Sequence, residues 1–417
     1  MNILFIHEVD WRDKVVYEPH CLSESLSLLG HRVYAIDYES NWTRDGIFDF
    51  GSLKTREFKK VSRAYSKASV YLRRPGFVKI PGISRLSAGL THYREIREII
   101  RGNDIDVVVL YSAPTNGLQA ISLSRKFEVP IVFRSIDILH QLVPHRILCL
   151  PIYLIERMVY SNVDLILALT PQLSQYVTRM GAKETKIKIL PEGVDTDLFR
   201  PGCDCSQLRK KWGVREQDFI VFFMGTLFEF SGLDAFLYRF PELIKQIPEA
   251  KLLIVGDGPQ RPKLERIAAG LRLKEQVVFT GFQPYETLPQ YINLATICIN
   301  PFLITKATAD VFPAKVLQYL ACGKGVIATP LPGMKSVILG EQQGIIYANS
   351  ADDIIREIIS LPKLAKRRKL LEETGLNYVR QVHSYNKIAK ELETMLLQVV
   401  ESRKPHIRKQ LSLDKGR

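Results

Sequence analysis

Short apolar runs, each followed by a helical pattern, recur along this chain, and that alternation limits the folds open to it. Asn2–His7 and Val33–Asp37 are predicted strands, and Glu24–Leu29 belongs to a helix between them. A strand, a helix and a further strand in this order begin a parallel sheet with helices on both faces. Further strands of the first half are predicted at Val107–Ser112, Ile131–Asp137, Val163–Thr170 and Lys186–Leu190.

The second half repeats the alternation. Phe219–Met224 and Ala250–Val255 are typical of buried strands, with helices from about Leu233 and over Arg261–Leu271. The turn after the first strand contains no glycine, which argues against a nicotinamide or flavin fingerprint there. Because 417 residues suffice for two domains, the chain is predicted to form two doubly wound α/β domains.

The segment Thr308–Pro330 joins a polar loop, a helix and a strand. Pro313 suits the first turn of a helix, because its missing N–H would lack a partner there. Apolar residues then recur at helical spacing, Gly323 stands where a C-terminal cap belongs, and Val326–Ala328 is a predicted strand. A helix N-terminus presents N–H groups and the positive end of the helix dipole, so this loop favours an anion.

Composition is that of a soluble globular protein, with 46% apolar and 24% charged residues. No apolar run reaches the ~18–20 residues that a membrane-spanning helix needs. Met1–Ile6 lacks a basic region, so a first strand is predicted there and not a signal peptide. The six cysteines show no zinc spacing, and we expect free thiols in a cytoplasmic protein.

The net charge of +14 calls for an anionic partner such as a phosphorylated substrate, a membrane surface or nucleic acid. Much of the excess lies in a basic insertion, about 43–90, that interrupts the alternation. It is interpreted either as a solvated, irregular segment or as a surface resting on anionic lipid, each base contributing ~1 kcal/mol. No recognition motif for nucleic acid is present. The basic residues are Lys54, Arg56, Lys59, Lys60, Arg63, Lys67, Arg73, Arg74, Lys79 and Arg85, and a basic tail contains Arg403, Lys404, Arg408, Lys409, Lys415 and Arg417.

Several stretches together resemble the large family of retaining, GT-B-fold glycosyltransferases that use nucleotide-sugar donors. Asp310 and Gln318 occupy the places of an acidic residue and a glutamate in the family's donor motif. Pro191–Pro201 is similar to the family's linker between its two halves, and Val255–Pro259 matches its second half. The resemblance covers roughly residues 186–350, whereas the first half matches in pattern only.

The resemblance implies a GT-B fold, with two Rossmann-like domains facing a central cleft and a last helix that crosses back to the first domain. The expected boundaries are 1–192 for the N-terminal acceptor domain, 193–380 for the nucleotide-sugar domain, and 381–417 for the returning helix and basic tail. Within these, the helix around residues 140–160 is expected to break at Pro151, and another to end at Gly375.

The family's donor site assigns roles to the segment before and inside the predicted helix. Asp310 is the expected catalytic residue that holds the donor sugar, and Gln318 keeps hydrogen-bonding capacity at the ribose position without the charge. Further expected donor contacts are Gly225, Thr226, Ser231, Gly256, Lys306, Pro313, Ala314, Lys315 and Val316.

The loop Gly225–Gly232 departs from the family pattern. Many relatives carry an arginine and a lysine that hold the diphosphate, where this chain has Thr226 and Ser231. Two charge-assisted contacts, each typically worth ~1.5–3 kcal/mol, are lost. Three explanations stay open: another base substitutes, the donor is not a conventional nucleotide-diphosphate sugar, or activity is lost. The candidate substitutes are Lys306, Lys315 and Arg134.

On the acceptor side, Asp137 and His140 are the catalytic candidates, because they follow the strand predicted from Ile131. A lone histidine is also common as a packed or solvated side chain. Glu8, Asp10 and Arg134 are further candidates for acceptor contacts.

The resemblance predicts transfer of a sugar from a nucleotide-diphosphate sugar to a lipid-linked or oligosaccharide acceptor, with retention, in cell-envelope or glycan biosynthesis. Such transfer requires stabilisation of the leaving group and deprotonation of the acceptor hydroxyl. We expect no metal and no cofactor besides the nucleotide sugar, and a cytoplasmic location, peripheral on the inner face of the cell membrane. The alternatives are a catalytically silent GT-B scaffold, a nucleotide-sugar isomerase and, from charge alone, a nucleic-acid binder.

Overall fold

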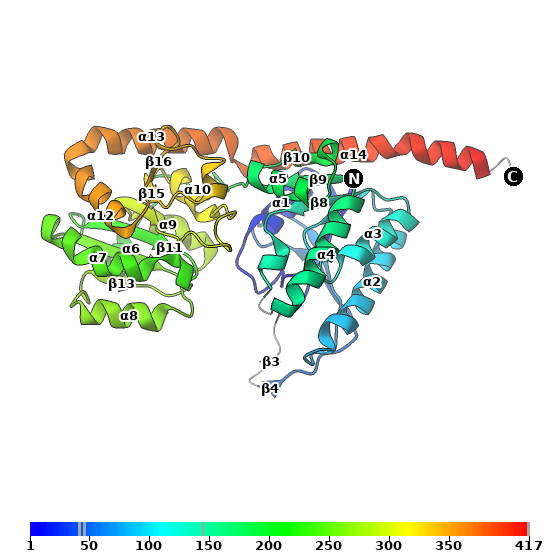
Figure 1. Ribbon diagram of the computed structural model, residues 1–417, viewed down its shortest axis with the longest axis horizontal. Helices are drawn as coiled ribbons and strands as arrows, with labels where there is room; N and C mark the ends of the chain where they lie inside the picture. Colours follow the sequence, from blue (N-terminus) through cyan, green and yellow to red (C-terminus); the bar gives the residue numbers. More distant parts are fainter. Residues whose placement is uncertain (41–42, 45–46, 144–145, 415–417) are drawn as a thin grey trace. The chain divides into compact units, whose positions relative to one another are not determined.

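The computed structural model describes residues 1–40, 43–44, 47–143 and 146–414 (Figure 1). The chain divides into two compact units. Unit 1 is Met1–Pro191 together with Tyr385–Arg417, and unit 2 is Glu192–Ser384. Each unit contains a largely parallel sheet with its own helices, so the prediction of two doubly wound α/β domains is confirmed.

Within the described residues, the sheet of unit 1 has eight strands in the order β10-β9-β8-β7-β1-β2-β6-β5. The chain passes from β1 to β2 and β6 on one side, and from β7 to β10 on the other. The strand order therefore reverses between β1 and β7, and ligands of doubly wound sheets bind at such a point. The strands are β1 (Asn2–Ile6), β2 (Arg32–Ile36), β5 (Arg56–Val61), β6 (Val70–Arg74), β7 (Val107–Leu110), β8 (Ile131–Ser135), β9 (Leu165–Ala168) and β10 (Ile187–Ile189).

Two apolar cores lie on the two faces of this sheet. Ile3 and Phe5 join one core, whereas Leu4 and Ile6 join the other, because successive side chains of a strand point to opposite faces. The helices that complete the cores are α1 (Glu18–Leu28), α2 (Ser84–Gly102), α3 (Gly117–Lys126), α4 (Arg146–Asn162) and α5 (Pro171–Arg179).

The last helix, α14 (Tyr385–Asp414), returns the chain to unit 1, as predicted. Ile388, Leu392 and Leu396 recur at helical spacing and share a core with Leu22 and Leu26 of α1. Residues 404–414 are described as helix backbone alone, and Lys415 and Arg417 of the predicted basic tail lie outside the described residues. No helix in the described ranges is long and apolar enough to cross a membrane.

The segment about 43–90 is not the irregular insertion that its charge suggested. It contributes β6, which is parallel to β2, and β5, which is antiparallel to β6 at the edge of the sheet. Exposed charged side chains on an edge strand discourage pairing with another chain, so a basic pattern here is compatible with a strand. A separate ribbon is formed by β3 (Thr43–Arg44) and β4 (Ile47–Phe48).

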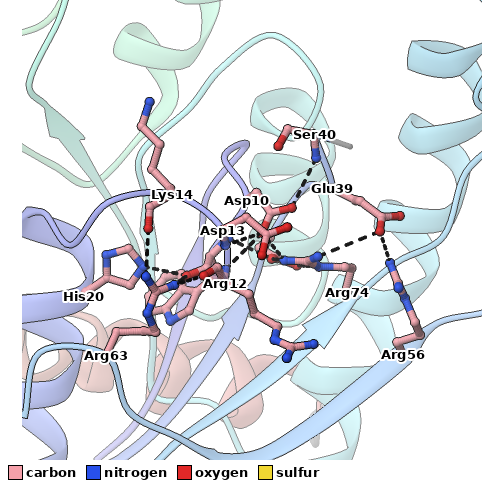
Figure 2. Close-up of polar contacts among 12 residues, drawn as sticks. Asp10, Arg12, Asp13, Lys14, His20, Glu39, Ser40, Arg56, Arg63 and Arg74 are labelled. Atoms are coloured by element: carbon pink, nitrogen blue, oxygen red, sulfur yellow. Dashed lines mark hydrogen bonds and ion pairs between the residues drawn. The ribbon is translucent and has the colours of Figure 1, made fainter. Parts of the chain in front are cut away.

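Many of the basic side chains of this segment pair with acids of unit 1, among them Arg56 and Arg74 (Figure 2). Arg74 is 3% exposed and pairs with Asp37 and with Asp10, the latter at 2.5 Å. Lys79 pairs with Glu39 (2.9 Å) and Asp49 (2.7 Å). These pairs weaken the argument that the segment presents its charge to lipid. Further pairs are Arg56–Glu39, Arg73–Glu57, Arg73–Glu95 and Arg85–Glu8, whereas Lys54, Lys59, Lys60 and Lys67 are exposed.

The sheet of unit 2 has six strands among the residues described, in the order β13-β12-β11-β14-β15-β16, and reverses between β11 and β14. Its strands are β11 (Phe219–Met224), β12 (Ala250–Val255), β13 (Val277–Phe279), β14 (Ile297–Asn300), β15 (Val326–Ala328) and β16 (Ile345–Tyr347). Its helices are α6 (Ser206–Trp212), α7 (Leu233–Gln246), α8 (Arg261–Gly270), α9 (Leu288–Asn293), α10 (Ala314–Ala321), α11 (Pro332–Lys335), α12 (Ala351–Ser360) and α13 (Ala365–Val382).

Two predicted helix ends are wrong. α4 continues through Pro151, whose exposed position near the start of the helix lets water bind the carbonyl that its missing N–H leaves unpaired. Gly375 lies inside α13, where it provides close packing and not a cap. A Cβ at Gly375 would come within 2.6 Å of Leu320 Cδ2.

Candidate functional site

In unit 2, the loops that follow β11 and β12 begin with glycine. Gly225 and Gly256 have φ angles of +139° and +133°, which glycine adopts readily. A Cβ at Gly256 would overlap the carbonyl oxygen of Gly225, because the two backbones pack against each other. Both glycines were predicted at the donor site, and the structure brings them together at the carboxyl edge of the sheet.

Lys315, in the first turn of α10, reaches the same edge. Its Nζ lies 4.4 Å from the ring centroid of Phe223 and 4.5 Å from that of Phe302. A Cβ at Gly225 would overlap this Nζ, so the ammonium lies against the loop after β11. Since Phe223 belongs to β11 and Phe302 follows β14, Lys315 marks the point where the strand order of unit 2 reverses.

The ammonium of Lys315 has aromatic neighbours and, among the described residues, no carboxylate within ion-pair distance. Burial lowers the pKa of Lys315 to about 7. A nearby anion would favour the charged form and raise this pKa again. The site is therefore suited to bind a negatively charged group.

The start of α10 largely follows the prediction. Pro313 is the N-cap, and Lys315 and Gln318 share a helix face because they are three residues apart. Ala314 is exposed, whereas Val316 is buried and its N–H donates to the Pro313 carbonyl (2.9 Å). The Val316 N–H is thus already bonded within the helix, and the donor contact expected from Val316 stays a prediction.

Asp310 is half-buried and lies just before α10. Its backbone packs against Gly333 of α11, where a Cβ would meet the Asp310 carbonyl oxygen at 2.5 Å. The Gly333 N–H also donates to the Ala309 carbonyl (2.7 Å). These contacts fix the backbone of Asp310, whose role toward a donor sugar stays a prediction.

The remaining predicted donor contacts differ in their exposure to solvent. Thr226 and Lys306 are exposed, and each follows a strand of the same sheet. Ser231 is 2% exposed, in the short 3-10 turn Glu229–Ser231. Its hydroxyl is not presented to solvent, so the predicted contact from Ser231 is not supported.

Unit 1 contains a cavity of about 1160 Å³ at the carboxyl ends of β1, β7 and β8. His7, Ser112 and Asp137 follow these three strands and line the cavity where the strands end, and this part of the cavity is called its inner end. Side chains from α2 and α4 line its walls. The cavity thus coincides with the reversal of strand order between β1 and β7, where a ligand of this sheet is expected.

Among the residues that the structure describes, His7 and not His140 is the histidine that lines this cavity. His7 Nε2 lies 3.2 Å from the Tyr17 hydroxyl, and burial, reinforced by His20, lowers the pKa of His7 to about 3. It is therefore neutral near pH 7 and suited to hydrogen bonding. His140 does not line the cavity, because its Nδ1 lies 2.9 Å from the buried carboxylate of Glu156. The catalytic role predicted for His140 is not supported, and sequence reasoning missed His7 because it was assigned to the first strand.

Asp137 lines the cavity, as its position after β8 predicted. Burial raises the pKa of this carboxyl above its usual value. A raised carboxyl pKa moves toward the pH at which a general base works best. Asp137 therefore remains the acid–base candidate of unit 1.

The three other acceptor candidates are mainly structural. Both carboxylate oxygens of Glu8 are bound, accepting from the N–H groups of Thr115 (2.6 Å) and Asn116 (2.9 Å) and from Arg85 (2.8 Å), although Glu8 also lines the cavity. Asp10 is buried against Arg74. Arg134 is 1% exposed and donates to Glu18 (2.8 Å) and to the Leu190 carbonyl (2.6 Å). Direct contacts from Asp10 and Arg134 to a substrate are therefore not supported.

Comparison with known proteins gives the family. The family model described as Glycosyl transferases group 1 matches residues 204–377, and that described as Glycosyltransferase Family 4 matches residues 20–198. The chain belongs to the group 1 glycosyltransferases. The two matched ranges together span most of both units, so the family resemblance of the first half extends beyond pattern.

Among curated group 1 relatives, the GDP-mannose-dependent alpha-(1-6)-phosphatidylinositol monomannoside mannosyltransferase of Mycolicibacterium smegmatis is 32% identical over 185 residues, 44% of this chain and 48% of that protein. The alpha-monoglucosyldiacylglycerol synthase of Streptococcus pneumoniae is 22% identical over 304 residues, 69% of this chain and 67% of that protein. The match to the first of these relatives thus spans about half of its length.

Solved structures place this group 1 chain in the GT-B fold. Sucrose-phosphate synthase from Thermosynechococcus elongatus superimposes with a TM-score of 0.73 at 18% identity, covering 96% of this chain and 100% of that one. Anabaena HepE in complex with UDP gives a TM-score of 0.68 at 15% identity, with 95% and 100% coverage. At these identities the likeness concerns the fold alone.

Proposed function

We propose that this protein moves a sugar from a nucleotide-diphosphate sugar to a hydroxyl of a lipid-linked or glycan acceptor, with retention of configuration. The observation that carries the proposal is Lys315, a cation without a carboxylate partner among the described residues, at the reversal point of the unit 2 sheet. Such points bind ligands in doubly wound sheets, and a charge-assisted contact to a phosphate there stabilises a departing diphosphate.

Lys315 supplies the charge that Thr226 and Ser231 do not. The first N–H groups of α10 and its dipole add positive potential beside it. The name of the mycobacterial relative specifies GDP-mannose, and HepE binds UDP, which supports a nucleotide diphosphate as the leaving group. Asp310, just before the helix, would hold the donor sugar.

The cavity of unit 1 would take the acceptor. Asp137 at its inner end is the group that would remove the proton from the attacking hydroxyl, and its raised pKa suits that role. Two relatives act on lipids by their names, a phosphatidylinositol mannoside and a diacylglycerol glycoside, which supports a lipid-linked acceptor. We further propose a cytoplasmic location at the inner membrane face, with no cofactor or metal besides the nucleotide sugar.

Thermal stabilisation by a panel of nucleotide sugars tests donor binding. A ligand at a hundred times its dissociation constant adds about 2.7 kcal/mol of stability, which a melting curve detects. Transfer to acceptors extracted from membranes then tests catalysis with the nucleotide sugar that stabilises the protein most.

Asp310→Ala should abolish transfer and leave the melting temperature unchanged, because the half-buried side chain is expected to contact the donor sugar. Asp352→Ala is a matched control, since Asp352 is also a half-buried acid of unit 2, on α12, where it pairs with Arg239 (2.7 Å). Full activity of Asp310→Ala would refute the role given to Asp310.

A catalytically silent protein is the second candidate, because Thr226 is neutral and Ser231 is buried where relatives place diphosphate-binding bases. Nucleotide-sugar binding without transfer or hydrolysis would favour it. Interconversion of free nucleotide sugars without an acceptor would instead identify an isomerase.

A further inference from the structure

We propose that the acceptor is an amphiphile in which a hydrocarbon chain is joined to a phosphate. The hydrocarbon chain lies between α2 and α4 in the cavity of unit 1. The inference rests on the proposed function, because it names the acceptor class of that reaction.

The walls of the cavity are apolar stripes on two helices. Leu86, Leu90 and Tyr93 of α2 line it at spacings of four and three residues. Leu148, Ile152 and Ile155 of α4 line it at the same spacings. Residues spaced in this way share one helix face, so each helix turns an apolar stripe toward the same space. α3 packs against both helices.

These stripes are unusually open to water. Leu86 is 73% exposed and Leu90 is 76% exposed. On α4, the wall residue Leu148 is 45% exposed, and Ile147 beside it is 87% exposed. Contiguous apolar surface of this kind marks a binding site more often than it occurs by chance on a monomer. A glycan would lose hydrogen bonds to water against these walls without replacement, whereas a hydrocarbon chain gains free energy there.

The inner end of the cavity is polar, so the bound molecule must be amphiphilic. Ser112 is 7% exposed, lines the cavity, and its Oγ has no hydrogen-bond partner among the described residues. His7 and Asp137 line the same end. A hydroxyl of the acceptor that reached this end could bond to Ser112 and face the carboxylate of Asp137.

Lys14 adds a positive charge to the lining. It borders both this cavity and a neighbouring one of about 380 Å³, and within the described residues it forms no ion pair. Its backbone is held, since Arg63 Nη2 donates to the Lys14 carbonyl (2.9 Å), and in Figure 2 its side chain extends away from Asp10 and Asp13.

The other charged groups of the lining leave Lys14 without compensation. Glu8 is already paired with Arg85 (2.8 Å), and the part of the chain that the structure describes contains no ion pair between Asp137 and Lys14. A phosphate between the chain and the hydroxyl-bearing head would be the natural partner of Lys14.

Calorimetry with octyl, decyl and dodecyl phosphate, below their critical micelle concentrations, tests whether the cavity binds a hydrocarbon chain. We expect one site per protein, and an affinity that rises about fourfold with each methylene that becomes buried. Leu90→Asp should lower the affinity for dodecyl phosphate at least about tenfold by placing a charge on the wall. Leu53→Asp is the matched control, since Leu53 is a 60% exposed leucine of unit 1 outside the cavity. This variant should bind dodecyl phosphate as tightly as the parent protein does.

Lys14→Ala tests the phosphate. Lys14→Ala should lower the affinity for dodecyl phosphate. It should not change the affinity for dodecyl maltoside, which has the same hydrocarbon chain and no charge. Lys59→Ala, at another exposed lysine of unit 1, should change neither. Farnesyl phosphate and lysophosphatidylglycerol distinguish a prenyl from an acyl source of the chain, and tight binding of either supports the proposal.

Equal affinities across the alkyl series, or unchanged binding by Leu90→Asp, would overturn the inference. The inference would also be overturned if sedimentation showed that Leu90→Asp dissociates a dimer and the affinity for alkyl phosphates did not change. A second copy of the protein would then occupy the apolar surface of the cavity. Nucleotide-sugar binding and transfer to a soluble glycan, without alkyl phosphate binding, would refute the lipid acceptor and leave the proposed transferase standing. Alkyl phosphate binding without any nucleotide-sugar binding would instead refute the transferase, and with it the acceptor role.

Discussion

Arg74 in unit 1 and Lys315 in unit 2 are both cations largely removed from water, yet they are held differently. Burial alone would lower the pKa of Arg74, but Asp37 and Asp10 raise it above the usual value. Lys315 lies between two aromatic rings, and burial lowers its pKa to about 7 without any carboxylate to offset it. A buried cation with matched acids belongs to the architecture, whereas one without them is available to an anionic ligand.

The largest expected effect is the loss of stability when Arg74, the cation with carboxylate partners, is replaced. Arg74→Met should lower the free energy of unfolding by about 3–5 kcal/mol, because it leaves the carboxylates of Asp10 and Asp37 buried without their partner. Urea denaturation of the parent and variant measures this. Lys59→Met, at an exposed lysine of the adjacent strand β5, should stay within about 0.5 kcal/mol. Equal stabilities of Arg74→Met and Lys59→Met would erase the contrast drawn between Arg74 and Lys315.

The opposite sign is expected at the uncompensated cation. Lys315→Met should leave the stability unchanged or raise it, since it removes a partly buried charge that has no carboxylate partner among the residues described. It should weaken nucleotide-diphosphate binding at least about tenfold, or about 1.4 kcal/mol, measured by calorimetry with the nucleotide that stabilises the protein most. Lys335→Met is a matched control, because Lys335 is an exposed lysine of unit 2 whose Nζ lies 5.9 Å from the Tyr347 ring centroid. Unchanged nucleotide affinity would remove Lys315 from the site.

The smallest effect is the pH dependence of nucleotide binding. Free Lys315 loses its proton above about pH 7, and a bound diphosphate favours the protonated form, so binding takes up a proton above this pH. The affinity should therefore fall as the pH rises from about 7 to 9, and the total loss should not exceed the loss caused by Lys315→Met, which removes the same charge. Lys315→Arg, which stays charged, should flatten the profile.

The same shift has a consequence for folding. An unfolded lysine has a pKa of about 10.4, so between about pH 7 and that value the unfolded chain binds more protons at Lys315 than the folded chain does. Lys315 should therefore make stability rise with pH over this window, and Lys315→Met should remove that part of the slope. If the stability of the parent protein fell with rising pH and that of Lys315→Met did not, the lowered pKa of Lys315 would be contradicted.

Local patterns predicted the backbone around α10 well. Pro313 and Gly323 bracket α10 because one lacks an N–H and the other adopts a φ of +67°, and both rules act within a few residues. The same rules failed at Gly375, where a glycine inside a helix serves close packing against another element and gives no local sign of it.

Side-chain partnerships were predicted poorly. The basic segment about 43–90 looked like an uncompensated surface because its partners Asp10, Asp37 and Glu8 lie elsewhere in the sequence. His140 was preferred over His7 because proximity to a strand end does not reveal which way a ring points. The packing of β8 and α4 directs His140 to Glu156, and the alignment of β1 with β7 brings His7 to the cavity.

The sequence by itself determined most of the elements, their order and the family, since periodicity, caps and turns depend on neighbours along the chain. Tertiary structure alone decided which charges are matched and which remain available, as the environments of Arg74 and Lys315 show. The physical reason is that desolvation and ion pairing depend on what surrounds a side chain in space, and strands distant in sequence supply those surroundings.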